Sequence, residues 1–299
     1  MPTTERTLTA PITGPVCLDL TMPSGVIDVT VADTDRAQIT LTTDDPADGT
    51  AARAISEASA RTDVRVMTVH VPTPAAGQHG TTIINTGTGR TVITGTAAAG
   101  VVIIGGNNHG NVFSGGQVIS GGILTYVIRA AITLPCGSAL RVGTKTGMVT
   151  TNGELEWVEF SSLSGGLNVD TCVRLDARST SGSICAKVAD HATVRTVSGD
   201  IDLQRSDAVT ATSSSGDIRV DNFAGSAQVS TVSGDIDIHV CEPGQVAASS
   251  SSGDVTVTAP AELAASPDLS VQARSLSGRV RIPQPPVSPH RPRRPRRTF

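Results

Sequence analysis

Four aspartates stand at nearly equal intervals in the second half of the chain, each directly after a Ser-Gly pair: Asp200, Asp217, Asp235 and Asp254. Carboxylates stacked above one another can supply the converging oxygens that Ca²⁺ requires. The known Ca²⁺-binding β-roll repeat, however, is only nine residues long, about half the interval seen here. We therefore expect these side chains to bond backbone amides in turns, and we keep a metal site on this column as the weaker alternative.

A second set of polar residues could do hydrolytic chemistry. Asp202, Arg219 and Asp237 each lie three positions after the glycine of such a turn, so they line up on one outer face. Glycoside hydrolysis uses two carboxylates, but aromatic residues, which form sugar platforms in such enzymes, make up only 2% of the chain. We expect no enzymatic activity, no catalytic residues and no cofactor. The three side chains are expected to form a ladder of alternating charges.

Cysteine and histidine give no sign of a redox or metal centre. The cysteines are odd in number and none has CxxC spacing, which predicts reduced, buried structural thiols in a cytosolic protein; they are Cys17, Cys136, Cys172, Cys185 and Cys241. The six histidines share no ligand spacing. Residues 1–25 contain no basic segment followed by an apolar run. We expect a cytoplasmic protein, with a surface or secreted location by another route as the alternative.

Positive charge is concentrated after Pro283, in Arg291, Arg293, Arg294, Arg296 and Arg297. Without these five charges the net charge of −4 becomes −9, so the rest of the chain would repel nucleic acid and anionic lipid. A short Pro- and Arg-rich tail is expected to be disordered and can contact an acidic partner. The other partner is expected to be an unknown protein or a second copy, with no specific nucleic acid and no transmembrane segment.

An internal repeat positions all of these residues. Glycines recur at spacings of 18, 17, 17, 17, 18, 19 and 25, at Gly147, Gly165, Gly182, Gly199, Gly216, Gly234, Gly253 and Gly278. Ser or Thr precedes each glycine directly, and another Ser or Thr lies three positions before it. Apolar residues alternate on both sides, which is typical of strands with one buried face. We expect the glycines to supply positive φ at the turns.

The apolar positions seven and five before the glycine alternate in size. Over four successive repeats they read Ala192-Val194, Val209-Ala211, Ala227-Val229 and Val246-Ala248. Large side chains would thus lie over small ones, as interdigitated packing requires. This predicts that equivalent positions stack in parallel strands. A third corner is expected at Val188, Phe223 and Val240.

The remaining segments complete the predicted organisation. Residues 16–42 look like a first version of the same coil, residues 50–61 are predicted to be a helix capping one end, and residues 64–71 a strand. Residues 72–124 form a Gly/Asn/Thr-rich insert, either small coils or a mobile segment. The predicted divisions are 1–71 for N-terminal strands and cap, 72–124 for the insert, 125–282 for the repeats and 283–299 for the tail. Residues 259–269 are expected to form a bulge or short helix.

With its repeats aligned, the chain resembles a bacterial family known as "putative adhesin", a domain of unknown function with Ser-Gly-Asp-Ile strand repeats. The resemblance covers about residues 16–71 and 125–282. It rests on SGDI at 198–201, 215–218 and 233–236, SGDV at 252–255, and AITLPCGSALRV at 131–142. It implies a right-handed parallel β-solenoid and no established activity. The insert and the arginine tail lie outside the family pattern.

The predicted fold is all-β: a right-handed parallel β-solenoid, or β-helix, of about 17–19-residue coils with one short N-terminal helix. The predicted function is a non-enzymatic structural or interaction module, an adhesin-like scaffold. A carbohydrate-binding or polysaccharide-active β-helix is the alternative, which requires an outer face that gathers acids and aromatics; counting register, we expect none. A self-assembling, cytoskeleton-like polymer is a third possibility, and the expected cap disfavours it.

Overall fold

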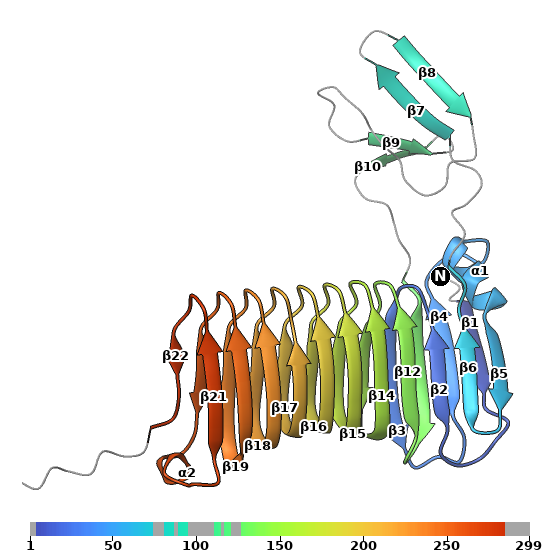
Figure 1. The fold of residues 1–299 in the computed structure, drawn as a ribbon. Helices are drawn as coiled ribbons and strands as arrows, with labels where there is room; N and C mark the ends of the chain where they lie inside the picture. Colours follow the sequence, from blue (N-terminus) through green and yellow to red (C-terminus); the bar gives the residue numbers. More distant parts are fainter. Residues whose placement is uncertain are drawn as a thin grey trace, which may run out of the picture.

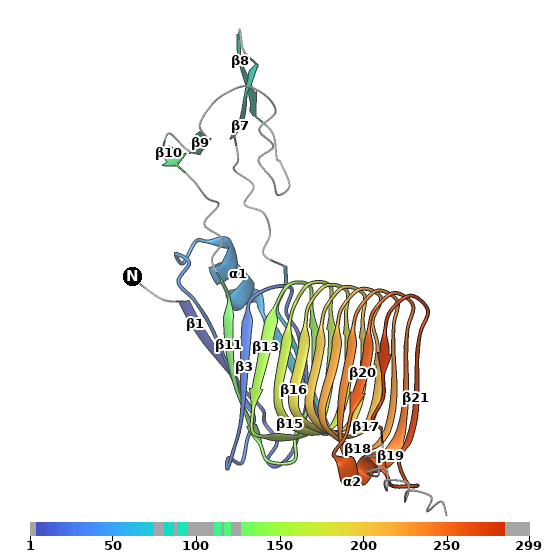
Figure 2. The ribbon, with the colours of Figure 1, turned by 90° about the vertical axis from the view of Figure 1, so that its left-hand side faces the viewer.

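The computed structural model describes residues 4–73, 81–86, 89–94, 111–114, 117–120 and 127–284. Within them the chain is mostly β-structure with two short helices. Eighteen strands belong to one large, mostly parallel sheet, which winds into stacked coils (Figures 1 and 2). The all-β, solenoid-like fold predicted from the repeat is therefore confirmed.

The elements fall into three groups along the chain. The N-terminal group contains β1 (Thr4–Thr9), β2 (Cys17–Thr21), β3 (Val26–Ala32), β4 (Gln38–Thr43), α1 (Thr50–Glu57), β5 (Ser59–Asp63) and β6 (Val66–His70). The insert contains β7 (Thr81–Thr86), β8 (Gly89–Thr94), β9 (Asn111–Ser114) and β10 (Gln117–Ser120). The repeats contain β11 (Arg129–Pro135), β12 (Ala139–Thr144), β13 (Met148–Asn152), β14 (Glu154–Ser162), β15 (Leu167–Ser179), β16 (Ile184–Thr196), β17 (Ile201–Thr212), β18 (Ile218–Thr231), β19 (Ile236–Ser250), β20 (Val255–Thr258), α2 (Ala261–Ala264), β21 (Ser270–Ser275) and β22 (Val280–Arg281).

The described strands of the insert pair as hairpins. Strand β7 is antiparallel to β8, and β9 is antiparallel to β10. These parts are therefore not small parallel coils, which was one of our two expectations. The rest of residues 74–126 lies outside the described residues, as does the tail from residue 285 onward.

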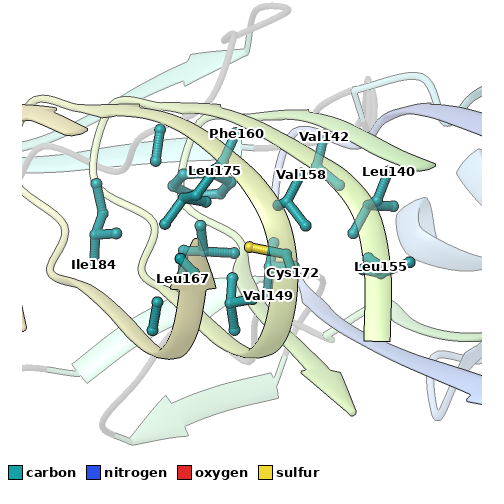
Figure 3. Packing of buried hydrophobic residues seen from close by; sticks show 14 of the residues in the cluster. Leu140, Val142, Val149, Leu155, Val158, Phe160, Leu167, Cys172, Leu175 and Ile184 are labelled. Atoms are coloured by element: carbon teal, nitrogen blue, oxygen red, sulfur yellow. The ribbon is translucent and has the colours of Figure 1, made fainter. Parts of the chain in front are cut away.

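The predicted stacking of equivalent positions is confirmed by the pairing of the strands. Ile184 pairs with Ile201, Ile201 with Ile218, and Ile218 with Ile236, all in parallel. The size alternation also holds, because Ala192 pairs with Val209. The same pairing continues from Val209 to Ala227 and from Ala227 to Val246. Burial of these rows forms one long, thin core, part of which Figure 3 shows.

The third corner differs from the prediction at one residue. Phe223 and Val240 are fully buried there, as expected, but Val188 is only partly buried, and Ala189 takes the inward position instead. Ala189 pairs with Cys172 of the preceding coil. Farther along the row, Phe223 pairs with Ser206 of the preceding coil and with Val240 of the following one.

The glycine column has a different physical basis from the one we expected. None of its members has positive φ; that conformation occurs at Gly25, with φ of 135°, in the first coil. The backbone of the preceding coil instead passes too close to leave room for a side chain. A Cβ atom on Gly216 would lie 2.0 Å from the carbonyl oxygen of Gly199. Each glycine therefore lies against the carbonyl group of the glycine one coil before it.

Buried hydroxyl groups three positions before the glycines join consecutive coils. Ser250 Oγ accepts a hydrogen bond from the amide of Gly253 (2.9 Å) and donates one to the carbonyl oxygen of Gly234 (3.1 Å), one coil earlier. The same double bonding recurs at Ser179, Thr231 and Ser275. Buried polar atoms need such partners, and here the partners belong to two successive coils. The sequence displays the Ser/Thr column, but we did not predict this role.

The first coil in the sequence is not the outermost coil in space. Strand β3 pairs in parallel with β11 on one side and with β13 on the other. Strand β2 likewise lies between β6 and β12. The chain therefore forms an inner coil, builds the cap outside it, and returns through β11 before the regular repeats begin.

The N-terminal end is covered by α1 and by antiparallel strands. The predicted helix is confirmed over Thr50–Glu57, but residues 59–61 belong to β5, because Ala58 adopts an extended backbone (ψ 135°) that ends the helix. Asp45 Oδ2 accepts a hydrogen bond from the amide of Ala51 at 2.7 Å and so caps the first turn. The strand expected at 64–71 begins at Val66, since Val64 (φ 50°) lies in the turn between β5 and β6.

The short helix, one of the two expectations for residues 259–269, is present as α2, so the described residues contain two helices and not only the N-terminal one of the predicted fold. Pro260 precedes it with φ fixed at −54°, and the following Ala-Glu-Leu-Ala run favours helix. This short helix accounts for the widened final spacing of the glycines.

Replacing Gly216 with Ala is expected to lower the free energy of unfolding by about 2–3 kcal/mol, because the added Cβ overlaps a backbone oxygen that cannot move independently. Gly143→Ala is the matched control, since a Cβ there would come no closer than 3.9 Å to Thr21 Oγ1; we expect a change below about 0.5 kcal/mol. Urea unfolding followed by circular dichroism measures both. Equal stability of the two variants would contradict the close-approach explanation.

Candidate functional site

The four aspartates of the column lie on one outer corner and bond to backbone amides of the following coil. Asp217 Oδ1 accepts a hydrogen bond from the amide of Asp235 at 2.8 Å, and Asp235 Oδ1 accepts one from the amide of Asp254 at 2.7 Å. Asp200 bonds the amide of Asp217, and Asp254 bonds that of Arg279. We expected bonds within a single bend; the structure shows bonds between successive coils.

This bonding pattern bears on the alternative of a metal site. Each aspartate of the column already uses one carboxylate oxygen on an amide. Across the described ranges, no three side chains of His, Cys, Asp or Glu gather where one ion could contact them all. The column is thus a continuous chain of carboxylate-to-amide bonds along the solenoid.

The predicted charge ladder forms in register but pairs differently. Asp202, Arg219 and Asp237 are neighbours on β17, β18 and β19. Arg219 Nε nevertheless donates to Asp221 Oδ2 on its own strand at 3.0 Å, and this hydrogen bond raises the pKa of the arginine. The ion pair runs along one strand because residues two apart lie on the same face of a strand.

A shallow, open hollow of about 270 Å³ lies on this face, lined by Arg219, Asp221, Asp237, Ile238, His239, Thr256 and Thr258. His239 Nδ1 lies 2.9 Å from Thr258 Oγ1. The hollow brings Asp237 beside Asp221, whereas Asp202 is not part of its lining. The two carboxylates that the sequence suggested for hydrolysis therefore do not share it.

Farther along the same face, another carboxylate is held by two donors. Lys187 Nζ donates to Asp170 Oδ1 at 2.9 Å, and the amide of Gly153 donates to Asp170 Oδ2 at 3.1 Å. Both bonds lower the pKa of Asp170. As in the Asp column, the carboxylate forms hydrogen bonds with groups on neighbouring coils.

A cluster around Trp157 lies on the face built by the segments before the glycines. The Arg141 guanidinium lies 5.4 Å from the centre of the indole ring, and Arg141 Nε donates to Glu159 Oε2 at 2.7 Å. The indole Nε1 donates to Asp176 Oδ2 at 3.1 Å, and Arg174 Nε bonds the same oxygen at 2.9 Å. Acids and an aromatic do gather on one outer face, so our expectation from register counting was wrong.

The sequence contained the signal for this cluster. Trp157 and Arg174 each lie eight positions before a column glycine, while Arg141, Glu159 and Asp176 lie six before one. The strand pairing sets Trp157 beside Arg174 and Glu159 between Arg141 and Asp176. Before the glycines we followed only the buried columns and not the outward ones, and therefore missed it.

The five cysteines are free thiols with different degrees of burial. Cys172 is buried in the corner row between Leu155 and Ala189, and burial raises its pKa to about 12. Cys136 and Cys241 are exposed, which corrects the expectation of buried thiols. Cys136 lies in the turn after β11, and no apolar row of the core reaches it.

Two further predictions concern partners outside the fold. The five arginines expected to contact an acidic partner lie beyond residue 284, outside the described residues. In the part of the chain that the structure describes, none of the helices has the length and apolar character needed to span a bilayer.

A protein-family model described as Toastrack DUF4097 matches residues 18–222 and again residues 206–294. No curated protein matches the chain. A solved structure of a "putative adhesin" from Bacteroides fragilis is 11% identical with a TM-score of 0.44, covering 93% of this chain and 97% of the other. A "putative lipid binding protein" from Parabacteroides distasonis is 12% identical with a TM-score of 0.47, covering 93% and 97%.

The Asp column can be tested at Asp235. Asp235→Ala is expected to lower the free energy of unfolding by about 1 kcal/mol, because the amide of Asp254 loses its acceptor. Asp235→Asn keeps an oxygen in the same place and is expected to remain near the wild type. Urea unfolding at pH 7, with and without millimolar Ca²⁺, measures both effects. Stabilisation of the wild type by Ca²⁺ that Asp235→Asn abolishes would instead support the metal alternative.

Proposed function

The chain belongs to the toastrack DUF4097 family, and on this premise we propose that it is a non-enzymatic structural or interaction module, an adhesin-like scaffold. The observation that carries the proposal is that the outer polar side chains bond to one another and to the backbone. The Asp column is bonded to amides, Arg219 to Asp221, and Asp176 to both Trp157 and Arg174. Such groups hold a fixed, patterned surface that another macromolecule can recognise.

The proposed scaffold is a right-handed parallel β-solenoid. Parallel crossover connections are overwhelmingly right-handed, and the coils of 17–19 residues follow from the glycine spacing. Because hydroxyls such as Ser179, Thr231 and Ser250 join successive coils, and the Asp column joins the coils from Asp200 onward, the faces are expected to be rigid. Solenoids use such long faces as extended binding surfaces.

Carbohydrate binding is the second candidate, and the Trp157 cluster favours it. An indole ring flanked by acids and arginines offers both a stacking surface and hydrogen-bonding groups. Arg141 and Asp176 already contact this ring, so a sugar would have to displace or share those contacts. The polymer alternative is disfavoured by the N-terminal end, which α1 and β5 cover.

The scaffold proposal is tested by photo-crosslinking in the source organism. A photo-reactive residue replaces either Gln204 or Thr210, exposed positions on the faces after and before the glycines; each serves as the control for the other. We expect a crosslinked macromolecule from one face only. No crosslink from either face, together with sugar release from polysaccharides that Asp237→Asn abolishes, would overturn the proposal in favour of an enzyme.

The second candidate is tested by fluorescence, because Trp157 is the only tryptophan in the chain. If the scaffold proposal is right, soluble polysaccharide fragments leave its emission unchanged. A saturable shift in emission that is lost in Arg174→Ala, but kept in Arg195→Ala on the same face, would favour carbohydrate binding at this cluster.

A further inference from the structure

The C-terminal end of the solenoid exposes apolar side chains that the earlier coils bury. Val255 and Val257 are 0% and 1% exposed, whereas Val280 and Ile282, the equivalent positions one coil later, are 41% and 47% exposed. Leu276 is not part of this row: it lies two positions before Gly278, an outward position that is also exposed in earlier coils at Leu163, Val197 and Val232. The core row thus ends with an open apolar cross-section.

The same end also presents strand edges. Strand β21 pairs with β19, and β22 pairs with β20; within the described residues neither has a partner on its other side. Figure 1 shows both strands at the outermost position of the coils. An edge of this kind is a template for pairing with another chain. The N-terminal end differs, because α1 packs there and Arg6 donates to the carbonyl oxygen of Ile55 at its last turn.

The last coil is less acidic than the rest of the molecule. It carries three exposed arginines, Arg274, Arg279 and Arg281, against two exposed acids, Glu262 and Asp268, and two of the arginines, Arg279 and Arg281, lie at or next to β22. Arg279 takes the position of the Asp column, and Arg281 pairs with Thr256, which in turn pairs with Asp237. The sequence adds five more arginines after Pro283. Without those five, the net charge of the chain is −9, so these arginines belong to an otherwise acidic molecule.

These features distinguish between possible occupants. A second copy docked through its own C-terminal end would bring the two sets of arginines together, and the opposite end of a second copy is covered by α1 and β5. The Arg279 side chain also has no oxygen to accept the next backbone amide, so the Asp column cannot continue into another copy. A bilayer would leave the edge amides and carbonyls unsatisfied in hydrocarbon. The following segment of this chain contains Pro283, Pro285 and Pro286, which cannot donate to a strand edge.

We propose that the C-terminal end, defined as β21, β22 and Ile282, binds an acidic, extended segment of a partner protein that adds to the sheet as a further strand. Backbone bonds to the edge would give affinity, and alternate side chains would give specificity. Apolar residues of the segment would cover Val280 and Ile282, and its carboxylates would pair with Arg279 and Arg281. This inference rests on the proposed function and names the kind of partner that the module binds.

The probe is a fluorescent peptide that copies residues 232–240, an acidic strand of the chain itself, and the measurement is anisotropy with the full-length protein. The double variant Arg279→Glu with Arg281→Glu is expected to bind it about tenfold more weakly. The matched control is Arg178→Glu with Arg195→Glu, two exposed arginines that pair with each other in the middle of the solenoid. We expect this control to bind the peptide as tightly as the wild type does.

Three results would overturn the inference: no peptide binding, equal binding of a peptide with lysines in place of both aspartates, or equal loss in the control variant. Dimers in sedimentation velocity that the Arg279 and Arg281 changes abolish would assign the end to a second copy. Binding to anionic vesicles without peptide binding would assign it to a membrane. Crosslinks from Gln204 or Thr210 would still support the scaffold, so the two proposals can fail separately.

Discussion

The close approach of successive coils at the glycine corner is the constraint on which the rest of the structure depends. Parallel strands must lie about 4.8 Å apart, and the corner must keep that distance while the chain turns. It does so by placing the carbonyl oxygen of one glycine where the next would carry a Cβ, as Gly199 does against Gly216. Any larger residue would push the coils apart and break the register of both adjoining strands.

That register then determines what each column of side chains can do. Inward columns must alternate in size, which explains the pairing of alanine with valine along the core. Buried hydroxyls such as Ser250 bridge two coils because the same spacing brings two backbone groups within reach. Outward columns place like residues above one another, so Asp217 reaches the amide of Asp235. Equivalent residues of successive repeats therefore make equivalent hydrogen bonds in successive coils.

The sequence predicted the coils, the pairing and most of the core, because those follow from spacing and alternation alone. It did not reveal why glycine is required at the turns. Glycine is favoured both where another coil passes too close for a side chain and where φ is positive, so the residue type alone does not distinguish the two causes. The ion-pair partner of Arg219 could not be predicted either. The strand register places Asp202, Asp237 and Asp221 all nearby, and only the side-chain geometry of the structure selects Asp221. The Trp157 cluster was predictable, but only by following the columns on both faces.

The position of β2 and β3 has a consequence for how the molecule comes into being on the ribosome. These strands are made early, yet their neighbours β12 and β13 come much later; the amide of Val16 bonds Ser138, 122 positions further along the chain. Pairings so distant in sequence form slowly. The edges of the early coil that β11, β12 and β13 later cover therefore stay unpaired until those strands have been synthesised.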